Sequence, residues 1–371
     1  MVSSPPSPAP SLPLPAPPLQ GLTHAELVAA LAAAGGADAA AERLGADALR
    51  ALYVRDRGAS GIAGLVSLGH ERRARLTAAV ALPRLAREAV EPAADGSTRY
   101  AFRLHDGALV ESVLLPHHAG SGRYTVCVSS QAGCALACRF CATGKLGLTR
   151  SLAAWEIVDQ VAQVTGHAGV RASDIVFMGM GEPLQNEAAV YRAARVMTQA
   201  HGLQIGARRI TISTAGVVPA IHRFIDANEP WRLVFSLGAA VPEKRARLMP
   251  IQQRHSFEEF LDAVARYERH RRGKHVTLEY VAIRDLTMGD DDVAAIAALA
   301  RRGFRFLLNV IPFNPVGDEF AAPTMAEVRE WTRKLRPLGV PVKLRFSGGR
   351  ERAAGCGQLG TALLSRRRAS S

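Results

Sequence analysis

The chain of 371 residues is poor in aromatic residues and lacks any long apolar run. Only 3 Trp, 6 Tyr and 12 Phe are present, so we find no aromatic stacking platform for a single strand of nucleic acid. No apolar stretch reaches the length of a transmembrane helix. The N-terminus lacks a basic segment, and prolines interrupt its apolar residues, which argues against a secretory signal. We therefore expect a cytoplasmic protein that has no membrane partner.

Positive charge is in excess, with 46 Lys and Arg against 33 Asp and Glu and a net charge of +13. This excess favours a polyanionic partner, because clustered cations bind phosphates and release counterions. Arg-rich chains also become basic through codon usage alone, so charge by itself does not identify the partner. Hydrophobic residues make up 48% of the chain, which suits one large core or a large core with a smaller neighbour.

The five cysteines are unevenly placed: Cys127, Cys134, Cys138 and Cys141 crowd into one segment, and Cys356 lies far from them. An odd number crowded in this way does not fit a secreted disulfide scaffold and indicates metal or redox chemistry. The Cys-x3-Cys-x2-Cys segment supplies three thiolates, whereas closed zinc sites take four ligands. Three thiolates on a cubane iron–sulfur cluster leave one iron open to a substrate. The alternative is a three-Cys zinc site completed by a distant His.

Changes in composition and periodicity predict five parts. The N-terminus is rich in Pro and Ser, which is typical of a disordered tail. An Ala-rich stretch follows, in which we expect helices up to about Glu88, and two alternating runs after it suit a β-hairpin. The parts are a disordered Pro-rich tail (1–20), a small helical domain (21–90), a β extension (91–124), a (β/α) barrel (125–350) and a C-terminal loop with a reactive Cys and a basic tail (351–371).

Short apolar strands alternate with helical patterns from residue 125 onward. Helices are predicted over 151–165, 186–200 and 217–226, and the first of them carries an apolar stripe. Near-continuous apolar strands between helices are typical of a parallel sheet wound as a full or partial barrel. We predict an α/β protein with a partial (β/α) barrel, whose chemistry lies at the C-terminal ends of its strands.

Polar groups follow several of these strands. Gly181 and Glu182 lie in a Gly-rich turn, where glycine lets the backbone approach a ligand and Glu182 adds a carboxylate. The turn is not a dinucleotide fingerprint, because no third glycine follows at the required spacing. Taken singly, it is a tight turn, and Ser213, Ser236 and Asn309 are polar caps at strand ends.

Taken together, the motifs resemble a known family. The string CVSSQAGCALACRFCATGKLGLTRSL at 127–152 resembles the radical S-adenosylmethionine (SAM) RNA adenine methyltransferases of the RlmN/Cfr family. The resemblance spans about 45–365 and includes, in order, DGSTRYAF, LVESVLLP, FMGMGEPL, RITISTAGVVP, LMPIQ, LNVIPFNP and AAGCGQL. It implies a radical SAM barrel and RNA methylation that uses a [4Fe-4S] cluster and two SAM molecules per turnover.

The resemblance also implies a role for each cysteine. Cys134, Cys138 and Cys141 would bind the [4Fe-4S] cluster. Cys356 would take a methyl group from a first SAM by displacement, and a 5′-deoxyadenosyl radical from a second SAM would remove hydrogen from that methyl group. The carbon radical would add to an adenine ring carbon. Cys127 would then resolve the adduct through a transient disulfide with Cys356; without the resemblance, Cys127 is a core residue.

Glu111 is the one acidic residue among apolar neighbours in its predicted strand. A buried carboxylate with a raised pKa suits proton transfer, and the resemblance implies that Glu111 is the proton acceptor. The alternative is an outward-facing Glu on an alternating strand. For SAM binding, the resemblance implies Gly181, Glu182, Ser213, Ser236, Leu237, Gly238 and Asn309.

The chain departs from the family pattern at Gly238, where the family has His. Loss of the imidazole removes a side-chain contact to SAM or substrate, and a backbone contact can survive. The stretch 286–290 also differs, and the loop 117–123 is longer than usual. These changes leave the chemistry intact and leave the RNA substrate open.

Three functions follow as hypotheses. The first is methylation of adenine C2 in 23S rRNA, with tRNA as a further substrate. The second keeps this chemistry and moves it to adenine C8. The third is a non-catalytic metal-containing RNA-binding protein, which predicts no SAM cleavage and tolerance of Cys356→Ala. For the enzyme we expect a monomer with RNA as its partner and a flavodoxin or ferredoxin as electron donor.

Overall fold

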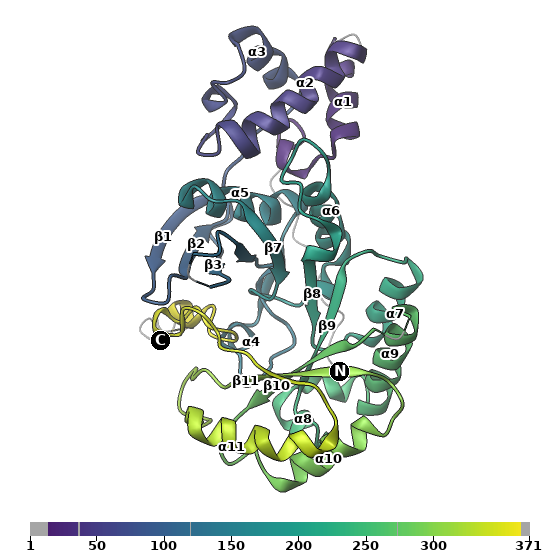
Figure 1. The fold of residues 1–371 in the computed structure, drawn as a ribbon. Helices are drawn as coiled ribbons and strands as arrows, with labels where there is room; N and C mark the ends of the chain where they lie inside the picture. Colours follow the sequence, from purple (N-terminus) through teal and green to yellow (C-terminus); the bar gives the residue numbers. More distant parts are fainter. Residues whose placement is uncertain (1–13, 36–37, 119, 273, 365–371) are drawn as a thin grey trace. The chain divides into compact units, whose positions relative to one another are not determined.

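The computed structural model describes residues 14–35, 38–118, 120–272 and 274–364, which are traced in Figure 1. The first 13 residues of the predicted disordered tail (1–20) and the basic tail from residue 365 therefore lie outside the described residues. Residues 14–20 are described, and the expectation of disorder is wrong for Leu19 and Gln20, which are fully buried. Within the described residues, no helix is both long and apolar enough to span a membrane. The chain forms two compact units, of which the first comprises 1–132, 149–179 and 186–210, and the second comprises 133–148, 180–185 and 211–371.

The first unit begins with packed helices, as predicted. At the start of α1, the Thr23 hydroxyl accepts a hydrogen bond from the Glu26 backbone while the Glu26 carboxylate accepts one from Thr23, a reciprocal cap. The expectation of helix up to about Glu88 is wrong, because Pro83 cannot continue a helix and the chain then pairs as a strand. The helical elements are η1 (Leu19–Gly21), α1 (His24–Ala33), α2 (Asp38–Arg50), the π-helical turn η2 (Ala51–Arg55), η3 (Ile62–Gly64) and α3 (His70–Ala79).

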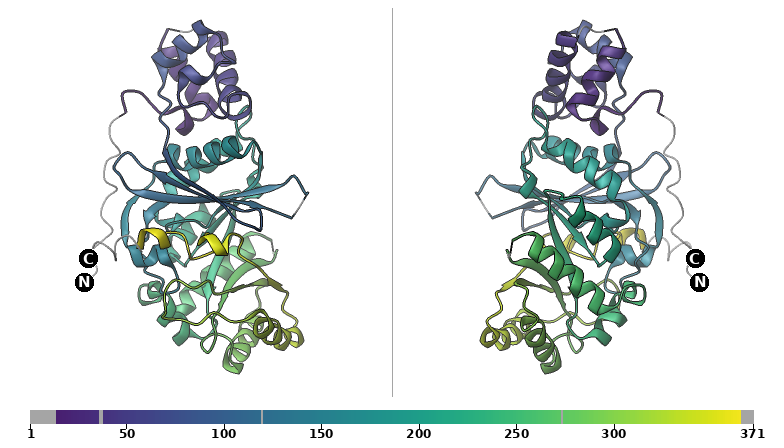
Figure 2. Two further views of the ribbon diagram at one scale, coloured as in Figure 1. Left: turned by 90° about the vertical axis from the view of Figure 1, so that its left-hand side faces the viewer. Right: turned by 90° about the vertical axis from the view of Figure 1, so that its right-hand side faces the viewer.

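A five-stranded arrangement follows in the first unit, in the order β1-β2-β3-β4-β7. The predicted hairpin is confirmed, since β2 and β3 pair in antiparallel register with Ala101 opposite Glu111. Helix α5 packs beside α6 and against β3 (Figure 2). The elements are β1 (Ala86–Pro92), β2 (Thr98–Arg103), β3 (Leu109–Pro116), β4 (Tyr124–Cys127), α5 (Ala154–Ala168), β7 (Ala172–Phe177), α6 (Glu187–Thr198) and η5 (Ala207–Arg209).

The second unit alternates parallel strands with helices, which confirms the predicted repeats and the α/β class. The strand order is β8-β9-β10-β11-β12, and α7 packs beside α9 and α10 beside α11 (Figure 1). The strands are β8 (Ile210–Thr214), β9 (Arg232–Gly238), β10 (Val276–Ala282), β11 (Phe306–Pro312) and β12 (Val342–Leu344). The helices are α4 (Ala142–Leu146), η4 (Pro183–Gln185), α7 (Val218–Asp226), α8 (Pro242–Leu248), η6 (Pro250–Gln253), α9 (Phe257–His270), α10 (Asp290–Ala300), α11 (Met325–Leu335), η7 (Arg336–Leu338) and η8 (Arg350–Arg352).

Two short strands, β5 (Gln131–Gly133) and β6 (Leu148–Ser151), pair with each other and flank the segment that carries three of the cysteines. The pairing of β5 with β6 brings the two ends of this segment close together.

Candidate functional site

The cysteine loop, residues 134–141, lies between β5 and α4 and folds tightly because of two glycines. Gly133 has a φ of +81°, and a Cβ there would lie 1.8 Å from the carbonyl oxygen of Gly147. Cys134 N donates to this same oxygen over 2.9 Å. A Cβ at Gly144 would lie 2.8 Å from Cys138 N, so α4 can approach the loop only with glycine at this position.

The three thiols of the cysteine loop are set in an apolar environment. Burial raises the pKa of Cys134 to about 12. Burial also raises the pKa of Cys138 well above its ordinary value, and that of Cys141. Such thiols stay protonated at neutral pH unless a metal displaces their protons. The loop contributes Leu136 to an apolar cluster, against which Cys134 and Cys138 pack. The other buried members of this cluster are Ala142, Ala215, Ala239, Leu248, Met249, Ile251, Ile283, Phe313 and Val316.

The donor set fits an iron–sulfur cluster. Backbone N–H groups of Leu136, Thr143 and Gly144 donate toward loop sulfurs, and such bonds are typical of cluster ligands. Within the described residues, no three His, Cys, Asp or Glu side chains converge on a single ion. The thiols nevertheless lie close enough to raise one another's pKa. Three thiols on one short loop, with backbone N–H donors beside them, fit the ligand set of a cubane cluster.

Glu182 lies beside the cysteine loop in the turn that follows Gly181. Its Oε1 accepts a hydrogen bond from Leu184 N over 3.1 Å, and its Oε2 accepts one from Ala215 N over 2.8 Å. Burial raises the pKa of Glu182 to about 7, although these hydrogen bonds oppose the rise. Gly181 has a φ of +98°, a conformation that favours glycine. The turn therefore presents a buried carboxylate suited to an ammonium group.

A row of polar side chains crosses the strands of the second unit. Ser213 Oγ lies 3.4 Å from Ser236 Oγ and 3.4 Å from Glu279 Oε2. Asn309 Nδ2 donates to Glu279 Oε1 over 3.5 Å, and Arg345 Nη1 donates to the same oxygen over 3.0 Å. Asn309 Oδ1 is buried and has no hydrogen-bond partner among the described residues, which leaves an acceptor for a ligand. The structure thus brings Ser213, Ser236 and Asn309 together, and their contact with SAM stays a prediction.

Sequence reasoning missed Glu279 at the centre of this row. It is an acidic residue in an otherwise apolar strand, which is the same signal that singled out Glu111. The register places Glu279 opposite both Ser236 and Asn309, and no motif in the sequence reveals this pairing.

Leu237 and Gly238 end β9. The Leu237 carbonyl accepts a hydrogen bond from Arg245 Nε over 3.1 Å. Gly238 has a φ of +71°, and an added Cβ would lie 2.5 Å from Met249 Sδ. Met249 therefore fills the space in which a family-type His side chain would begin. A side chain at position 238 would therefore require Met249 to move.

Hydrogen bonds hold the Cys356 turn against α4. Ala142 N donates to Gly357 O over 2.7 Å, and Thr143 Oγ1 donates to Leu359 O over 2.7 Å. Asn314 Nδ2 donates to Cys356 O over 3.0 Å. Cys356 is half-buried, and it lies close enough to Cys141 to raise the pKa of that thiol. The second unit therefore brings the proposed methyl carrier to the cysteine loop.

Glu111 and Cys127 belong to the first unit. Glu111 is 2% exposed and accepts a hydrogen bond from Arg99, so the outward-facing alternative is wrong. Ser129 Oγ donates to Glu111 O over 2.6 Å, and Ser129 N donates to Gln160 Oε1 over 2.9 Å. The first bond ties β3 to the turn after β4, and the second ties that turn to α5. Cys127 is buried and, like the other four cysteines, is not in a disulfide, so its pairing with Cys356 stays a prediction.

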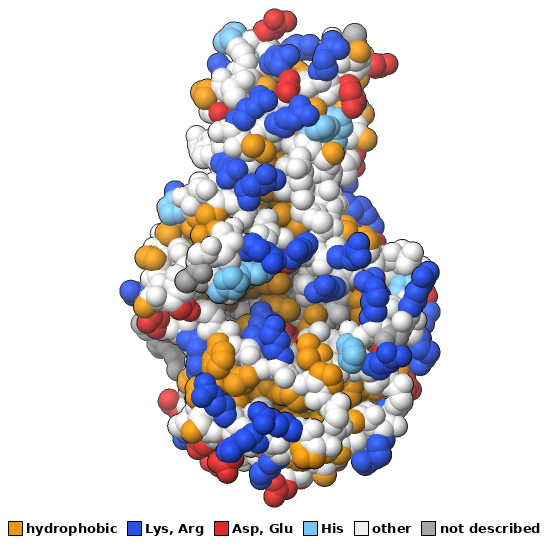
Figure 3. Space-filling view, viewed as in Figure 1, with side chains coloured by type: hydrophobic (Ala, Val, Ile, Leu, Met, Phe, Trp, Pro, Cys, Tyr) orange, Lys and Arg blue, Asp and Glu red, His pale blue; other side chains and the backbone are white. Residues whose placement is uncertain are grey.

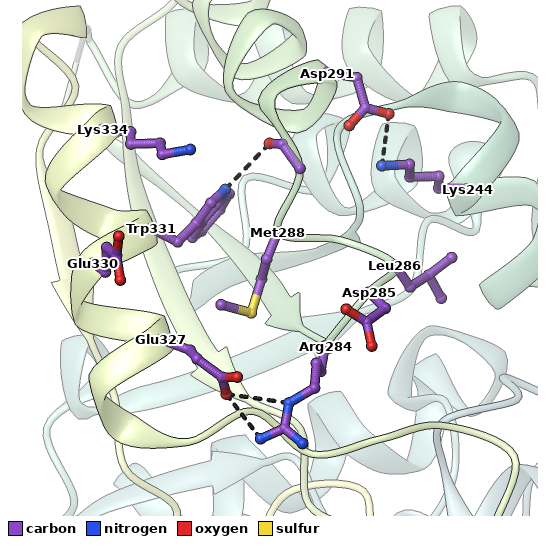
Figure 4. A pocket seen from close by; sticks show the side chains of 11 residues that line it. Lys244, Arg284, Asp285, Leu286, Met288, Asp291, Glu327, Glu330, Trp331 and Lys334 are labelled. Carbon is purple, nitrogen blue, oxygen red and sulfur yellow. Dashed lines mark hydrogen bonds and ion pairs between the residues drawn. The ribbon is translucent and has the colours of Figure 1, made fainter.

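The divergent stretch 286–290 belongs to a pocket of about 420 Å³ in the second unit (Figure 4). Its charged groups pair with each other: Lys244 lies 2.7 Å from Asp291, and Arg284 lies 2.9 Å from Glu327. The Trp331 indole donates to the backbone of the stretch. Among the described residues, this pocket has no predicted site residue in its lining.

Comparisons with known proteins agree with this geometry. A family model described as the Radical SAM superfamily matches residues 128–300. The chain is 41% identical over 284 residues to a probable RNA methyltransferase of Myxococcus xanthus, covering 76% of this chain and 78% of that protein. It is 40% identical over 308 residues to the dual-specificity RNA methyltransferase RlmN of Geobacter sulfurreducens, covering 83% of each. A crystal structure of a radical SAM methyltransferase from Sphaerobacter thermophilus matches with a TM-score of 0.84 and 36% identity, over 93% of this chain and 99% of that one.

The fold and the site define a radical SAM methyltransferase built on a partial (β/α) barrel. More narrowly, the chain belongs to the RlmN family of radical SAM RNA methyltransferases. The predicted family, fold class and enzyme class are confirmed, and the family implies a [4Fe-4S] cluster and SAM. An enzyme is thereby favoured over the non-catalytic hypothesis.

Proposed function

We propose that the protein is a cytoplasmic, monomeric methyltransferase that methylates carbon 2 of an adenine in 23S rRNA, with tRNA as a further substrate. The observation that carries the proposal is the meeting, within the second unit, of the cysteine loop, the Glu182 turn and the Cys356 turn. Relatives named as RNA methyltransferases, several of them as dual-specificity enzymes, support RNA as the substrate.

The surface charge supports a polyanionic substrate. Figure 3 shows Lys and Arg side chains spread over the face viewed in Figure 1. In the second unit, η8 holds Arg350 and Arg352 exposed just ahead of the Cys356 turn. Arginines placed there would contact phosphates and orient the strand, while the base enters the site.

In the proposed site, Cys134, Cys138 and Cys141 hold a [4Fe-4S] cluster. Glu182 would pair with the amino group of SAM, and the polar row with its free Asn309 acceptor would bind the rest of the molecule. When bound, the cluster and SAM supply the radical chemistry that activates the methyl group, with electrons from a flavodoxin or ferredoxin. Two SAM molecules are used per turnover, one as methyl donor and one as radical source.

The chain's own residues carry the methyl group. The Cys356 thiolate displaces the methyl group of SAM, forming a carbon–sulfur bond while the SAM sulfur leaves with the bonding pair. Glu111 accepts the proton that the adenine carbon gives up. The Cys127 thiolate then attacks the Cys356 sulfur, which forms a transient disulfide and breaks the bond from that sulfur to the methylene carbon on the base. The methylene carbon keeps the bonding pair and takes up a proton, which completes the methyl group. In this mechanism Cys356 and Cys127 are both indispensable.

Nucleoside mass spectrometry of rRNA and tRNA from a deletion strain tests this function. We expect 2-methyladenosine to disappear and to return with the wild-type gene, but not with the Cys356→Ala variant. The variant should still load iron, since Cys356 is not a cluster ligand. Loss of 8-methyladenosine instead would move the target to C8, and no change in either nucleoside would refute the RNA assignment.

A further inference from the structure

Arg245, on α8, is a buried cation without an acidic partner. Its side chain is 1% exposed, and its guanidinium donates only to neutral acceptors: Leu237 O at 3.1 Å, Ala215 O at 2.9 Å and Gln252 Oε1 at 3.1 Å. Among the described residues, Arg245 makes no ion pair with Asp or Glu. A buried charge is costly unless something of opposite sign compensates it, so Arg245 calls for a partner.

Two aromatic rings fix where the guanidinium lies. Its carbon is 4.3 Å from the ring centre of Phe260 and 5.7 Å from that of Phe257. Burial lowers the pKa of Arg245 to about 10, so it stays positively charged at neutral pH. With the rings and three hydrogen bonds holding it, the charge cannot turn toward solvent.

The held charge faces the cysteine loop. Arg139 N donates to Leu248 O over 3.0 Å, which ties the loop to the end of α8. Leu248 belongs to the same apolar cluster that contacts Cys134 and Cys138. Ala215, whose carbonyl oxygen accepts a hydrogen bond from the guanidinium, belongs to this cluster as well.

Arg245 also joins two parts of the proposed SAM site. It donates to the carbonyl oxygen of Ala215, whose own N–H donates to Glu182. It also donates to the carbonyl oxygen of Leu237, near the end of β9. The Arg245 side chain therefore lies near the proposed cluster ligands and also holds the strand ends of the proposed SAM site.

We propose that Arg245 is a positioning residue that gives the cysteine-bound cluster its fixed counter-charge and fastens the strand ends that bind SAM. This inference rests on the proposed role of the cysteine loop. A cubane held by three thiolates is an anion, and the one electron it takes from an external reductant makes it more negative. A fixed cation stabilises the reduced form more than the oxidised form and so raises the reduction potential.

Three variants of the full chain separate the two roles. Arg245→Met keeps the apolar stem and removes both the charge and the hydrogen bonds. Arg245→Lys keeps the charge but cannot make the same three directed bonds. Arg247→Met is the matched control, because Arg247 is an exposed residue of the same helix and its loss changes net charge equally.

The measurements are made without RNA on anaerobically reconstituted protein. They are iron and sulfide content, the midpoint potential of the cluster by EPR-monitored titration, and the dissociation constant of SAM. We expect Arg245→Met to shift the potential to more negative values and to weaken SAM binding about tenfold. Arg245→Lys should keep the wild-type potential while losing SAM affinity, and Arg247→Met should match wild type in both.

Equal potentials in Arg245→Met and Arg247→Met would overturn the inference. If Arg245→Met binds no cluster, the melting temperature of its apo form is the deciding measurement. A folded apo form supports the role of Arg245 toward the cluster. An unfolded apo form contradicts that role if Arg245→Lys also binds no cluster. A wild-type chain that binds no cluster would refute the proposed function as well. A wild-type enzyme with the expected potentials but no RNA product would refute only the RNA assignment.

Discussion

Gly238→Ala should destabilise the protein far more than the addition of one methyl group usually does. Gly238 has a φ of +71°, and a Cβ there would lie 2.5 Å from Met249 Sδ. Met249 is fully buried in the apolar cluster and has little room to move. The left-handed backbone costs alanine about 1 kcal/mol, and overpacking a filled core costs about 1–3 kcal/mol. The expected loss is therefore about 2–4 kcal/mol in the free energy of unfolding.

Urea unfolding of the reduced apo protein measures this loss. Gly303→Ala is the control, because Gly303 has a φ of +84° but no atom within 4 Å of an added Cβ. It should lose only the backbone part, about 1 kcal/mol. Met249→Ala opens space, so combined with Gly238→Ala it should cost less than the sum of the two single changes. Equal losses at Gly238 and Gly303, or additive losses in the double variant, would refute the reasoning.

Two further predictions concern buried charge. Burial raises the pKa of Glu182 from its ordinary 4.5 to about 7, so the folded protein favours the protonated carboxyl. The folded protein has the full stability that this proton confers below about pH 4.5, and it loses that stability as the pH rises through about 7. The melting temperature of the apo protein should fall across this window, and a Glu182→Gln variant with the same pH profile as wild type would contradict this. Arg99→Met leaves Glu111 buried without this ion pair and should cost about 3–5 kcal/mol in unfolding free energy. The same change at Arg103, which pairs on the surface with Glu88, should cost far less, because water screens that pair. Equal losses at the two positions would count against the prediction.

The sequence predicts best what depends on local spacing. The Cys-x3-Cys-x2-Cys segment and the position of Ser213 near the end of its strand follow from short motifs and the repeat of strands and helices. The expected strand-end position of Asn309 is wrong, because Asn309 lies in the middle of β11. The end of α3 was harder to predict, because the Ala- and Arg-rich residues near it favour helix while antiparallel pairing of β1 with β2 decides for strand.

The rest depends on contacts between distant residues. Glu279 joins the site through the register of β10 with its two neighbours, and pairing partners are not encoded in any one strand. Arg245 stands in a charged run, PEKRAR, that reads as a solvent-exposed helix face. Only the packed structure shows that this one arginine turns inward while Arg247 stays exposed.

The second unit is assembled from three separated stretches of chain, and this has a consequence for biosynthesis. The cysteine loop leaves the ribosome long before Gly357 and Leu359, whose carbonyl groups hold α4, and the Thr143–Leu359 bond spans 216 positions. On a growing chain, α4 therefore lacks both bonds until residue 359 has left the ribosome. A ribosome stalled before that residue would hold a chain whose cysteine loop lacks its covering turn.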